Sequence, residues 1–357
     1  MTKTVAVIPG EEAAAEAMEV SMHLLQQLDL DINWVYPPVG TEALESHGSL
    51  FPDAARTMID NSHATLFGAT SGPSTKALFY LRWGKQTFAN VRPTRYLKGF
   101  SSPLANPENV DFVIVRENLE DAYLFLEGDI EDLAPLNLTS RTAGQKAHEL
   151  GEGKYSVKAI TRTGSERVIR HAFTLARERA AQAGNGKRGK VTVGAKTNML
   201  PKTDGLFASV GKEIASEYPD IEHETLIIDD LAHKLISRTE EFDVLVMPNL
   251  YGDIMSDAAA GLVGGLGLAP SACIGDSYAY FESAHGTAPD IAGQGIINPT
   301  ATLLSAALML LYLGDVGTAQ RLERAIAEVY ANRTNLTPDQ GGNATTREFA
   351  EALLARM

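Results

Sequence analysis

Two aspartates stand at a spacing that can hold a metal ion. Asp253 and Asp257 lie in the segment Met247-Pro-Asn-Leu-Tyr-Gly-Asp-Ile-Met-Ser-Asp257, where an apolar strand-like run passes into a helix. Residues four apart share one helical face, and two carboxylates there repel each other unless a positive charge lies between them. A hard divalent cation suits that place best. Helix capping is the alternative and explains Asp253 better than Asp257. Asp229, after another strand-like run, can supply a third carboxylate.

A basic segment has the opposite character. Residues 61–107 contain no Asp or Glu and carry six cations: Lys76, Arg82, Lys85, Arg92, Arg95 and Lys98. A cleft lined by one sign of charge concentrates ligands of the other sign, and arginine binds planar carboxylates through paired hydrogen bonds. The segment therefore predicts a pocket for a small polyanion. A solvated basic face is the alternative.

A third segment has the composition of a nucleotide site. Residues 282–290, Glu-Ser-Ala-His-Gly-Thr-Ala-Pro-Asp, follow a strand-like run. A glycine-containing turn with His and Thr donors suits a phosphate or a ribose. Because no G-x-G-x-x-G lies between a strand and a helix, a standard Rossmann site is not indicated. His285 as a hydrogen-bonded structural histidine is the alternative.

Short apolar runs alternate with amphipathic stretches along the chain. Strands are predicted at residues 4–8, 32–36, 64–67, 113–115, 191–195, 226–228 and 244–247, and helices at 13–28 and 51–61. This alternation predicts an α/β fold with a parallel or mixed sheet covered by helices on both faces. Chemistry then lies where strands end. Residues 128–154 are polar, lack a clear period and are expected to form an extension at a domain edge.

Composition limits the function classes. The 357 residues allow two domains or one large α/β unit, and the net charge of −14 argues against nucleic-acid or anionic-membrane partners. A single cysteine, Cys273, excludes an internal disulfide framework and a cysteine-based zinc cluster. The most apolar segment, residues 301–313, is too short to span a bilayer. We therefore expect a cytoplasmic protein.

Together, these segments resemble the metal-dependent decarboxylating β-hydroxyacid dehydrogenases, which act on isocitrate, homoisocitrate and 3-isopropylmalate. The resemblance covers nearly the whole chain. Its most specific stretches are Asn90-Val-Arg-Pro93, Val115-Arg-Glu-Asn118 with Tyr123, Lys196-Thr-Asn-Met-Leu200, Asn249 through Asp257, His285-Gly-Thr-Ala-Pro-Asp290 and Asn298-Pro-Thr300. It implies an isopropylmalate-dehydrogenase-like fold with two α/β domains around a mixed sheet and a non-Rossmann NAD site. Residues 1–87 plus 265–357 would form the cofactor-side domain. Residues 88–264 would form the inserted domain, with a dimer clasp at about 125–160.

The resemblance also implies a role for each matching residue. Asp253 and Asp257 would bind Mg²⁺ or Mn²⁺, with Asp229 as a third ligand from the partner in a homodimer with shared active sites. Lys196, also across the dimer, would deprotonate the substrate hydroxyl, and Tyr123 would protonate the enolate. The substrate-side positions are Arg82, Arg92, Arg116, Lys76, Leu78, Phe79 and Asn198. The cofactor-side positions are Thr70, Glu282, His285, Gly286, Thr287, Ala288, Asp290 and Asn298.

Position 290 bears on the choice of cofactor. An acidic residue there can accept hydrogen bonds from the adenosine ribose and would repel a 2′-phosphate. NADP-using bacterial relatives resemble one another in having lysine at this position. Asp290 therefore predicts NAD.

The chain departs from the family pattern in one loop. Family members usually read Ile-Pro-Gly-Asp-Gly-Ile-Gly where this chain reads Ile-Pro-Gly-Glu-Glu-Ala-Ala at residues 8–14. Glycine permits backbone angles that glutamate and alanine resist. We therefore expect a differently shaped loop near the nicotinamide.

The residues before Arg82 give conflicting signals about the 3-substituent of the malate. Lys76 suits an anionic group, whereas Leu78 and Phe79 suit an alkyl group or simple packing. We favour an isocitrate- or homoisocitrate-like polycarboxylate, or another polyanionic malate such as a phosphonate, oxidised to a 2-oxo acid and CO₂. The alternatives are a 3-isopropylmalate-type alkylmalate, non-decarboxylating oxidation of tartrate or malate, and a non-catalytic regulatory subunit.

Overall fold

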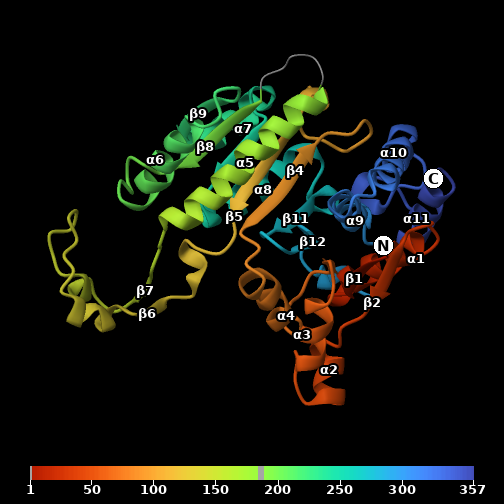
Figure 1. Cartoon of the computed structure of the whole chain (residues 1–357), viewed down its shortest axis with the longest axis horizontal. Coiled ribbons are helices and arrows are strands. Elements are labelled where there is room, and N and C mark those ends of the chain that lie inside the picture. The colour runs from red at the N-terminus through yellow and green to blue at the C-terminus, as the bar shows by residue number, and fades with distance from the viewer. Residues whose placement is uncertain (1, 184–188) are drawn as a thin grey trace.

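One large mixed sheet organises the molecule, described here from a computed structural model that covers residues 2–183 and 189–357. Its strand order is β2-β1-β3-β12-β11-β4-β5-β10-β8-β9 (Figure 1). The strands are β1 (Lys3–Ile8), β2 (Ile32–Val35), β3 (Ala64–Phe67), β4 (Ala89–Arg95), β5 (Asp111–Glu117), β8 (Lys190–Ala195), β9 (Glu222–Ile227), β10 (Val244–Met247), β11 (Pro270–Ile274) and β12 (Ala279–Ser283).

The sheet is parallel at both ends and antiparallel in the middle. Strands β11 and β12, β11 and β4, and β4 and β5 pair antiparallel, and all other neighbours pair parallel. This confirms the predicted α/β fold with a mixed sheet. Strands from both ends of the chain lie on one side of the β11–β4 pair, and strands from the middle of the chain lie on the other. Because one sheet runs through both parts, the domain boundaries at 87/88 and 264/265 stay a prediction.

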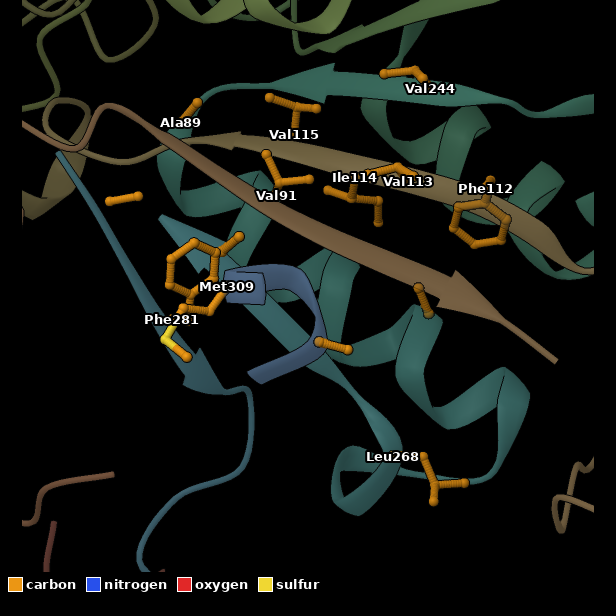
Figure 2. Packing of buried hydrophobic residues seen from close by; sticks show 14 of the residues in the cluster. Ala89, Val91, Phe112, Val113, Ile114, Val115, Val244, Leu268, Phe281 and Met309 are labelled. Carbon is orange, nitrogen blue, oxygen red and sulfur yellow. The ribbon is translucent and has the colours of Figure 1, made fainter. Parts of the chain in front are cut away.

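Helices cover the sheet and close the core. They are α1 (Glu12–Leu25), α2 (Gly40–His47), α3 (Asp53–Asp60), α4 (Thr75–Phe79), α5 (Arg162–Ala183), α6 (Thr203–Ala215), α7 (Ile228–Ser237), α8 (Asn249–Val263), α9 (Thr300–Leu313), α10 (Val316–Asn332) and α11 (Thr346–Leu354). Helix α8 packs on β4 and β5, α5 on β5, β10 and β8, and α9 on β11 and β12. Buried apolar side chains of β4, β5 and β10 belong to one cluster, in which Met309 of α9 lies beside Phe281 of β12 (Figure 2). Among the described helices, none has the length and apolar character to cross a membrane.

The extension predicted at residues 128–154 forms an arm that projects from the body (Figure 1). Its two-stranded sheet pairs β6 (Glu127–Asp129) antiparallel with β7 (Lys154–Ser156), and short 3₁₀ turns connect the two strands. Large apolar side chains on the arm are exposed in the single chain: Phe125, Leu126, Leu136, Leu138, Leu150 and Val157. Apolar groups so placed are usual at protein interfaces.

The loop between β1 and α1 keeps a glycine-like backbone without the glycine. Glu12 has a φ of 56°, in the left-handed region that glycine favours. Glu11 ties this loop to the loop after β3, because its carboxylate accepts hydrogen bonds from the Ser71 and Ser74 backbone N–H groups and from the Ser74 hydroxyl. Glu12, where the family pattern has glycine, therefore has a strained backbone conformation next to these two loops.

Candidate functional site

Two arginines and two aspartates meet at the centre of the sheet. Arg92 lies on β4 and Arg116 on the neighbouring β5, while Asp253 and Asp257 lie on α8, which begins directly after β10. Arg92 Nη1 donates to Asp257 Oδ1 at 2.8 Å, and Arg116 Nη1 pairs with Asp253 Oδ1. The spacing of four on α8 thus puts both carboxylates opposite the basic strands, as the sequence predicts.

Polar groups of α8 hold the two arginines in place. Arg92 Nη1 also donates to the Ser256 hydroxyl at 2.8 Å, and Arg116 Nε donates to Asn249 Oδ1 at 2.8 Å. Gly252 allows this close packing, because a Cβ there would lie 2.6 Å from the Arg116 side chain. Both arginines are buried, so their guanidinium groups are oriented before any ligand arrives.

Arg82 completes the basic group from a different element. It lies on a π-helical turn, Tyr80–Gly84, directly after α4. Its Nε donates to the Tyr280 hydroxyl at 3.4 Å, and its Nη2 lies 3.9 Å from Glu282 Oε1. The structure therefore places Glu282, predicted on the cofactor side, behind Arg82, with the buried Cys273 thiol 3.8 Å from the same oxygen.

Tyr123 faces the acidic pair. Its hydroxyl donates to Asp253 Oδ2 at 2.8 Å, and its ring lies 5.5 Å from the Arg116 guanidinium carbon. Partial burial raises the pKa of Tyr123, and the hydrogen bond to the Asp253 carboxylate raises it further. The phenol is therefore protonated at neutral pH, which is the state that a proton donor requires.

The charges in this cluster change one another's titration. Burial lowers the pKa of Arg116 to about 10; Asp253 opposes that shift, whereas Arg92 and Arg82 add to it. Burial and the nearby Asp253 raise the pKa of Asp257, although Arg92 counteracts them. Arg116 therefore lies within electrostatic reach of both other arginines.

Lys196 and Asp229 form a separate pair. Lys196 follows β8, Asp229 lies in the first turn of α7, and Lys196 Nζ donates to Asp229 Oδ1 at 2.5 Å. This pairing lowers the pKa of Asp229. In the part of the chain that the structure describes, no hydrogen bond or ion pair joins either residue to Asp253 or Asp257. Asn198 is exposed beside this pair.

The donor set fits a hard divalent cation only in part within one chain. Asp253 and Asp257 offer partly exposed carboxylate oxygens on one helical face, which is the chemistry that Mg²⁺ and Mn²⁺ prefer. Across residues 2–183 and 189–357, no three His, Cys, Asp or Glu side chains converge on a metal-sized site. Asp229 is paired with Lys196 instead, and among the described residues it makes no contact with Asp253 or Asp257.

The three residues predicted to contact the 3-substituent lie in different surroundings. Phe79 packs edge-on against Trp83, with ring centroids 5.1 Å apart, and lies 5.5 Å from Phe125. Leu78 packs against a buried apolar cluster. Lys76 is exposed and lines a hollow of about 460 Å³ together with Ser49, Phe51, Arg56, Phe79, Tyr80 and Gly84.

His285 offers an unused acceptor on the predicted cofactor side. Its Nδ1 lies 2.8 Å from the Gly286 carbonyl oxygen, which requires a proton on Nδ1. Burial lowers the pKa of His285, so the ring is neutral and Nε2 is an acceptor. Within the described chain, Nε2 is buried and has no hydrogen-bond partner. An orphaned acceptor of this kind fits a ligand hydroxyl or amine.

Some of the other predicted cofactor residues are exposed, and the rest are hydrogen-bonded within the chain. Asp290 and Gly286 are exposed, and Ala288 has a φ of 51° in the same turn. Asn298 is buried and donates to Asp339 Oδ2 at 2.9 Å and to the Tyr330 hydroxyl at 3.0 Å. The remaining two are Thr70, whose hydroxyl accepts from the Gly72 N–H, and Thr287, whose carbonyl accepts from the Ala14 N–H.

Sequence reasoning missed several supporting residues. Ser256 and Asn249 lie inside the segment that was singled out for its aspartates, so their polar side chains were a usable signal. Trp83 and Phe125 give no such signal, because their contact joins the π-helical turn after α4 to a segment that follows β5. Long-range packing of this kind carries no local pattern.

Comparison with known proteins agrees with this geometry. The profile of the family described as isocitrate/isopropylmalate dehydrogenase matches residues 4–353. The 3-isopropylmalate/3-methylmalate dehydrogenase of Methanocaldococcus jannaschii is 41% identical over 99% of this chain and 98% of its own length. The isocitrate/homoisocitrate dehydrogenase of Thermus thermophilus is 40% identical over 99% and 98%. The crystal structure of isocitrate dehydrogenase from Methylococcus capsulatus superposes with a TM-score of 0.84 at 35% identity and covers 99% of both chains.

The fold and the cluster of arginines, aspartates and tyrosine define an oxidoreductase of the decarboxylating dehydrogenase class. The chain belongs to the isocitrate/isopropylmalate dehydrogenase family. The resemblance drawn from the sequence motifs is thereby confirmed.

One buried acid next to the site gives a testable pH dependence. Glu117 follows Arg116 on β5, and its carboxylate accepts from the backbone N–H groups of Leu119 and Glu120 at 2.9 and 2.8 Å. Burial raises the pKa of Glu117 to about 7, although these two hydrogen bonds oppose the shift. A carboxyl whose pKa is higher in the folded state stabilises the fold below its unfolded pKa and loses that contribution as pH rises through 7.

We expect Glu117→Gln to flatten the pH dependence of stability. Between pH 5 and pH 8 the wild type should lose about 3 kcal/mol of unfolding free energy that the variant keeps, because glutamine has no proton to release. Urea unfolding at several pH values measures this, with Glu108→Gln on the exposed surface as control. Equal slopes in Glu117→Gln and wild type would contradict the assignment.

Proposed function

We propose that the protein catalyses the NAD-dependent oxidative decarboxylation of a 3-substituted malate with an apolar substituent, assisted by Mg²⁺ or Mn²⁺. The observation that carries the proposal is the meeting of Arg92 and Arg116 with Asp253 and Asp257 under the hydroxyl of Tyr123. Three arginines match the carboxylates of a malate, and two aspartates match a cation that binds the same ligand.

The chain's own residues divide the work of the reaction. Arg82, Arg92 and Arg116 bind and orient the carboxylates, so that C2 is held toward the nicotinamide. When bound at Asp253 and Asp257, a divalent cation supplies positive charge that favours ionisation of the 2-hydroxyl and later the enolate. Tyr123 holds its proton beside Asp253 and delivers it to carbon after CO₂ has left.

An apolar 3-substituent fits the surroundings better than the polyanion that the sequence favoured. The surroundings of Arg82 are aromatic, because Trp83 lies 5.6 Å from the Arg82 guanidinium carbon and packs with Phe79 and Phe125. Phe79 and Phe125 are 39% and 65% exposed, so an alkyl group can cover them. Lys76 is exposed, whereas Leu78 packs against a buried apolar cluster. Relatives named as 3-isopropylmalate dehydrogenases support the same choice.

NAD is the proposed cofactor because of the charge at position 290. Relatives named for NAD and for NADP both occur in the family, so membership alone does not decide. Asp290 is exposed in the turn next to the unused His285 acceptor. A carboxylate there accepts ribose hydroxyls and repels a 2′-phosphate.

A homodimer would complete the site. Lys196 and Asp229 lie apart from Asp253 within one chain, although each has the chemistry that the site lacks. Exposed apolar side chains surround both parts: Ile254 beside Asp253, Met199 and Leu200 beside Lys196, and those of the arm. A second copy that covered these surfaces could bring its own Lys196 and Asp229 to the aspartate pair. Retention of all these groups also argues against a non-catalytic subunit.

The direct test is turnover by the purified chain. With 3-isopropylmalate, 3-methylmalate, isocitrate and homoisocitrate as substrates, we expect NADH formation with Mn²⁺ present and none with a chelator. CO₂ released per NADH should be one. Asp253→Asn should lower kcat by at least about 100-fold, because it removes a cation ligand and the charged partner of the Tyr123 hydroxyl.

Three outcomes would each contradict part of this proposal. Absence of turnover on every malate would exclude the dehydrogenase activity. NADH formation without CO₂ would leave a dehydrogenase but exclude decarboxylation. Activity with NADP equal to that with NAD would contradict the role given to Asp290.

Two variants should show whether the 3-substituent of the substrate is apolar or anionic. Phe79→Ala should lower kcat/KM for 3-isopropylmalate by about tenfold, since apolar surface is lost at the pocket wall. Lys76→Ala should lower it by less than about twofold, because an alkyl substituent carries no charge with which the Lys76 ammonium group could pair. Steady-state kinetics with isocitrate in parallel give the comparison. A preference for isocitrate that Lys76→Ala abolishes would show that the substituent is anionic.

A further inference from the structure

Lys158 lies in a buried ion cluster outside the candidate site. It follows β7 by two residues, and 19% of its side chain is exposed. Its Nζ lies 3.3 Å from Asp121 Oδ1 and 3.0 Å from Asp204 Oδ2, and both carboxylates are fully buried. The ammonium also lies 4.3 Å from the centroid of the Tyr251 ring. One cation thus pairs with two buried acids that are far apart in the sequence.

The first of these acids holds the segments that carry the metal-site aspartate and the proton donor. Asp121 Oδ2 accepts from the backbone N–H of Leu250, in the first turn of α8, at 2.9 Å. Asp121 itself comes two residues before Tyr123 and has a φ of 71°. Tyr123 and Asp253 are hydrogen-bonded to each other. Asp121 therefore sets the backbone on both sides of that contact.

The second acid holds the segment that carries the lysine of the other pair. Asp204 Oδ1 accepts from the backbone N–H of Lys196 at 2.8 Å, while Oδ2 faces Lys158. The Lys196 side chain then reaches Asp229. Both acids act as charged backbone acceptors, and such hydrogen bonds are stronger than neutral ones.

Loss of Lys158 would leave both carboxylates buried without a counter-charge. A buried acid in that state becomes protonated or moves toward water. Either change weakens its bond to the backbone N–H that it holds. Displacement of a reacting group by about 1 Å can cost on the order of 100-fold in rate.

We propose that Lys158 is a positioning residue that joins the segment of Tyr123 and Asp253 to the segment of Lys196. The inference rests on the proposed function, in which Tyr123 and Asp253 act in one active site and Lys196 acts in that of the partner. One lysine then sets the geometry of both active sites of the dimer. Because it directly follows β7, it also connects the arm to both sites.

Kinetics of single variants are the first test. Lys158→Gln should lower kcat by at least about tenfold, with the KM for the malate within about twofold, because the three arginines are not in contact with Lys158. Lys158→Arg should restore most of the rate, since it keeps the charge. Lys154→Gln, on the exposed lysine four residues earlier, is the matched control. If Lys158→Gln gives no folded dimer, Asp204→Asn breaks one arm of the cluster and should give the same split between kcat and KM.

Mixed dimers test the connection between the two sites. A dimer of one Lys196→Met chain and one Tyr123→Phe chain has a single complete site, with Tyr123 from the first chain and Lys196 from the second. We expect Lys158→Gln to lower kcat when placed in either chain. Only in the chain that supplies Asp253 should it also raise the KM for Mn²⁺.

The outcomes separate this inference from the proposed function. Wild-type dimers that oxidise no malate would overturn the proposed function. An active wild type whose kcat is unchanged by Lys158→Gln in both placements would overturn the positioning role alone. An effect confined to one placement would overturn the connection between sites.

Discussion

The attraction between Arg92 and Arg116 and the two aspartates of α8 is the interaction on which the site depends. Arg92 pairs with the partly exposed Asp257 and Arg116 with the partly exposed Asp253. Both arginines are buried, so leaving them unpaired would be costly. The arginines therefore keep the aspartates together without a cation, and the aspartates keep the arginines together without a carboxylate ligand. A substrate and a cation have to replace these pairs jointly. Either one alone would leave charges of one sign facing each other.

The sheet order explains why these residues meet. Strands β4 and β5 pair antiparallel, which brings Asn90 opposite Arg116 and leaves Arg92 two residues along. Strand β10 pairs with β5 so that Met247 lies opposite Arg116, and α8 begins just after it. The helix thus starts directly above the arginine strands, and Asp253 and Asp257 reach them from its first two turns. This arrangement arises because β11 and β4, in the middle of the sheet, pair antiparallel with their neighbours, while the strands on both sides pair parallel.

Local patterns in the sequence predicted much of the sheet and of the site. The apolar strand runs, the spacing of four between Asp253 and Asp257, and the acid-free residues 61–107 are all visible in residues that are near one another in the sequence. The aspartate pair, the three arginines and Tyr123 lie together as expected. Patterns could not predict that Glu282 lies behind Arg82, or that Phe79 meets Trp83 and Phe125, since both depend on packing between distant elements. Glu12 adopts a φ of 56°, in the left-handed region, although its residue type disfavours that angle. Neighbouring contacts of Glu11 outweighed local preference there.

Coupling between cation and malate tests the central claim most directly. Calorimetric titration with Mn²⁺, without NAD so that no turnover occurs, should be run with and without the malate that the enzyme oxidises best. The arginine–aspartate pairing predicts weak Mn²⁺ binding alone and an affinity at least about tenfold higher with the malate bound, after correction for chelation in solution. Equal affinities in the two titrations would contradict the account, because the cation would then enter without any need to release the arginines.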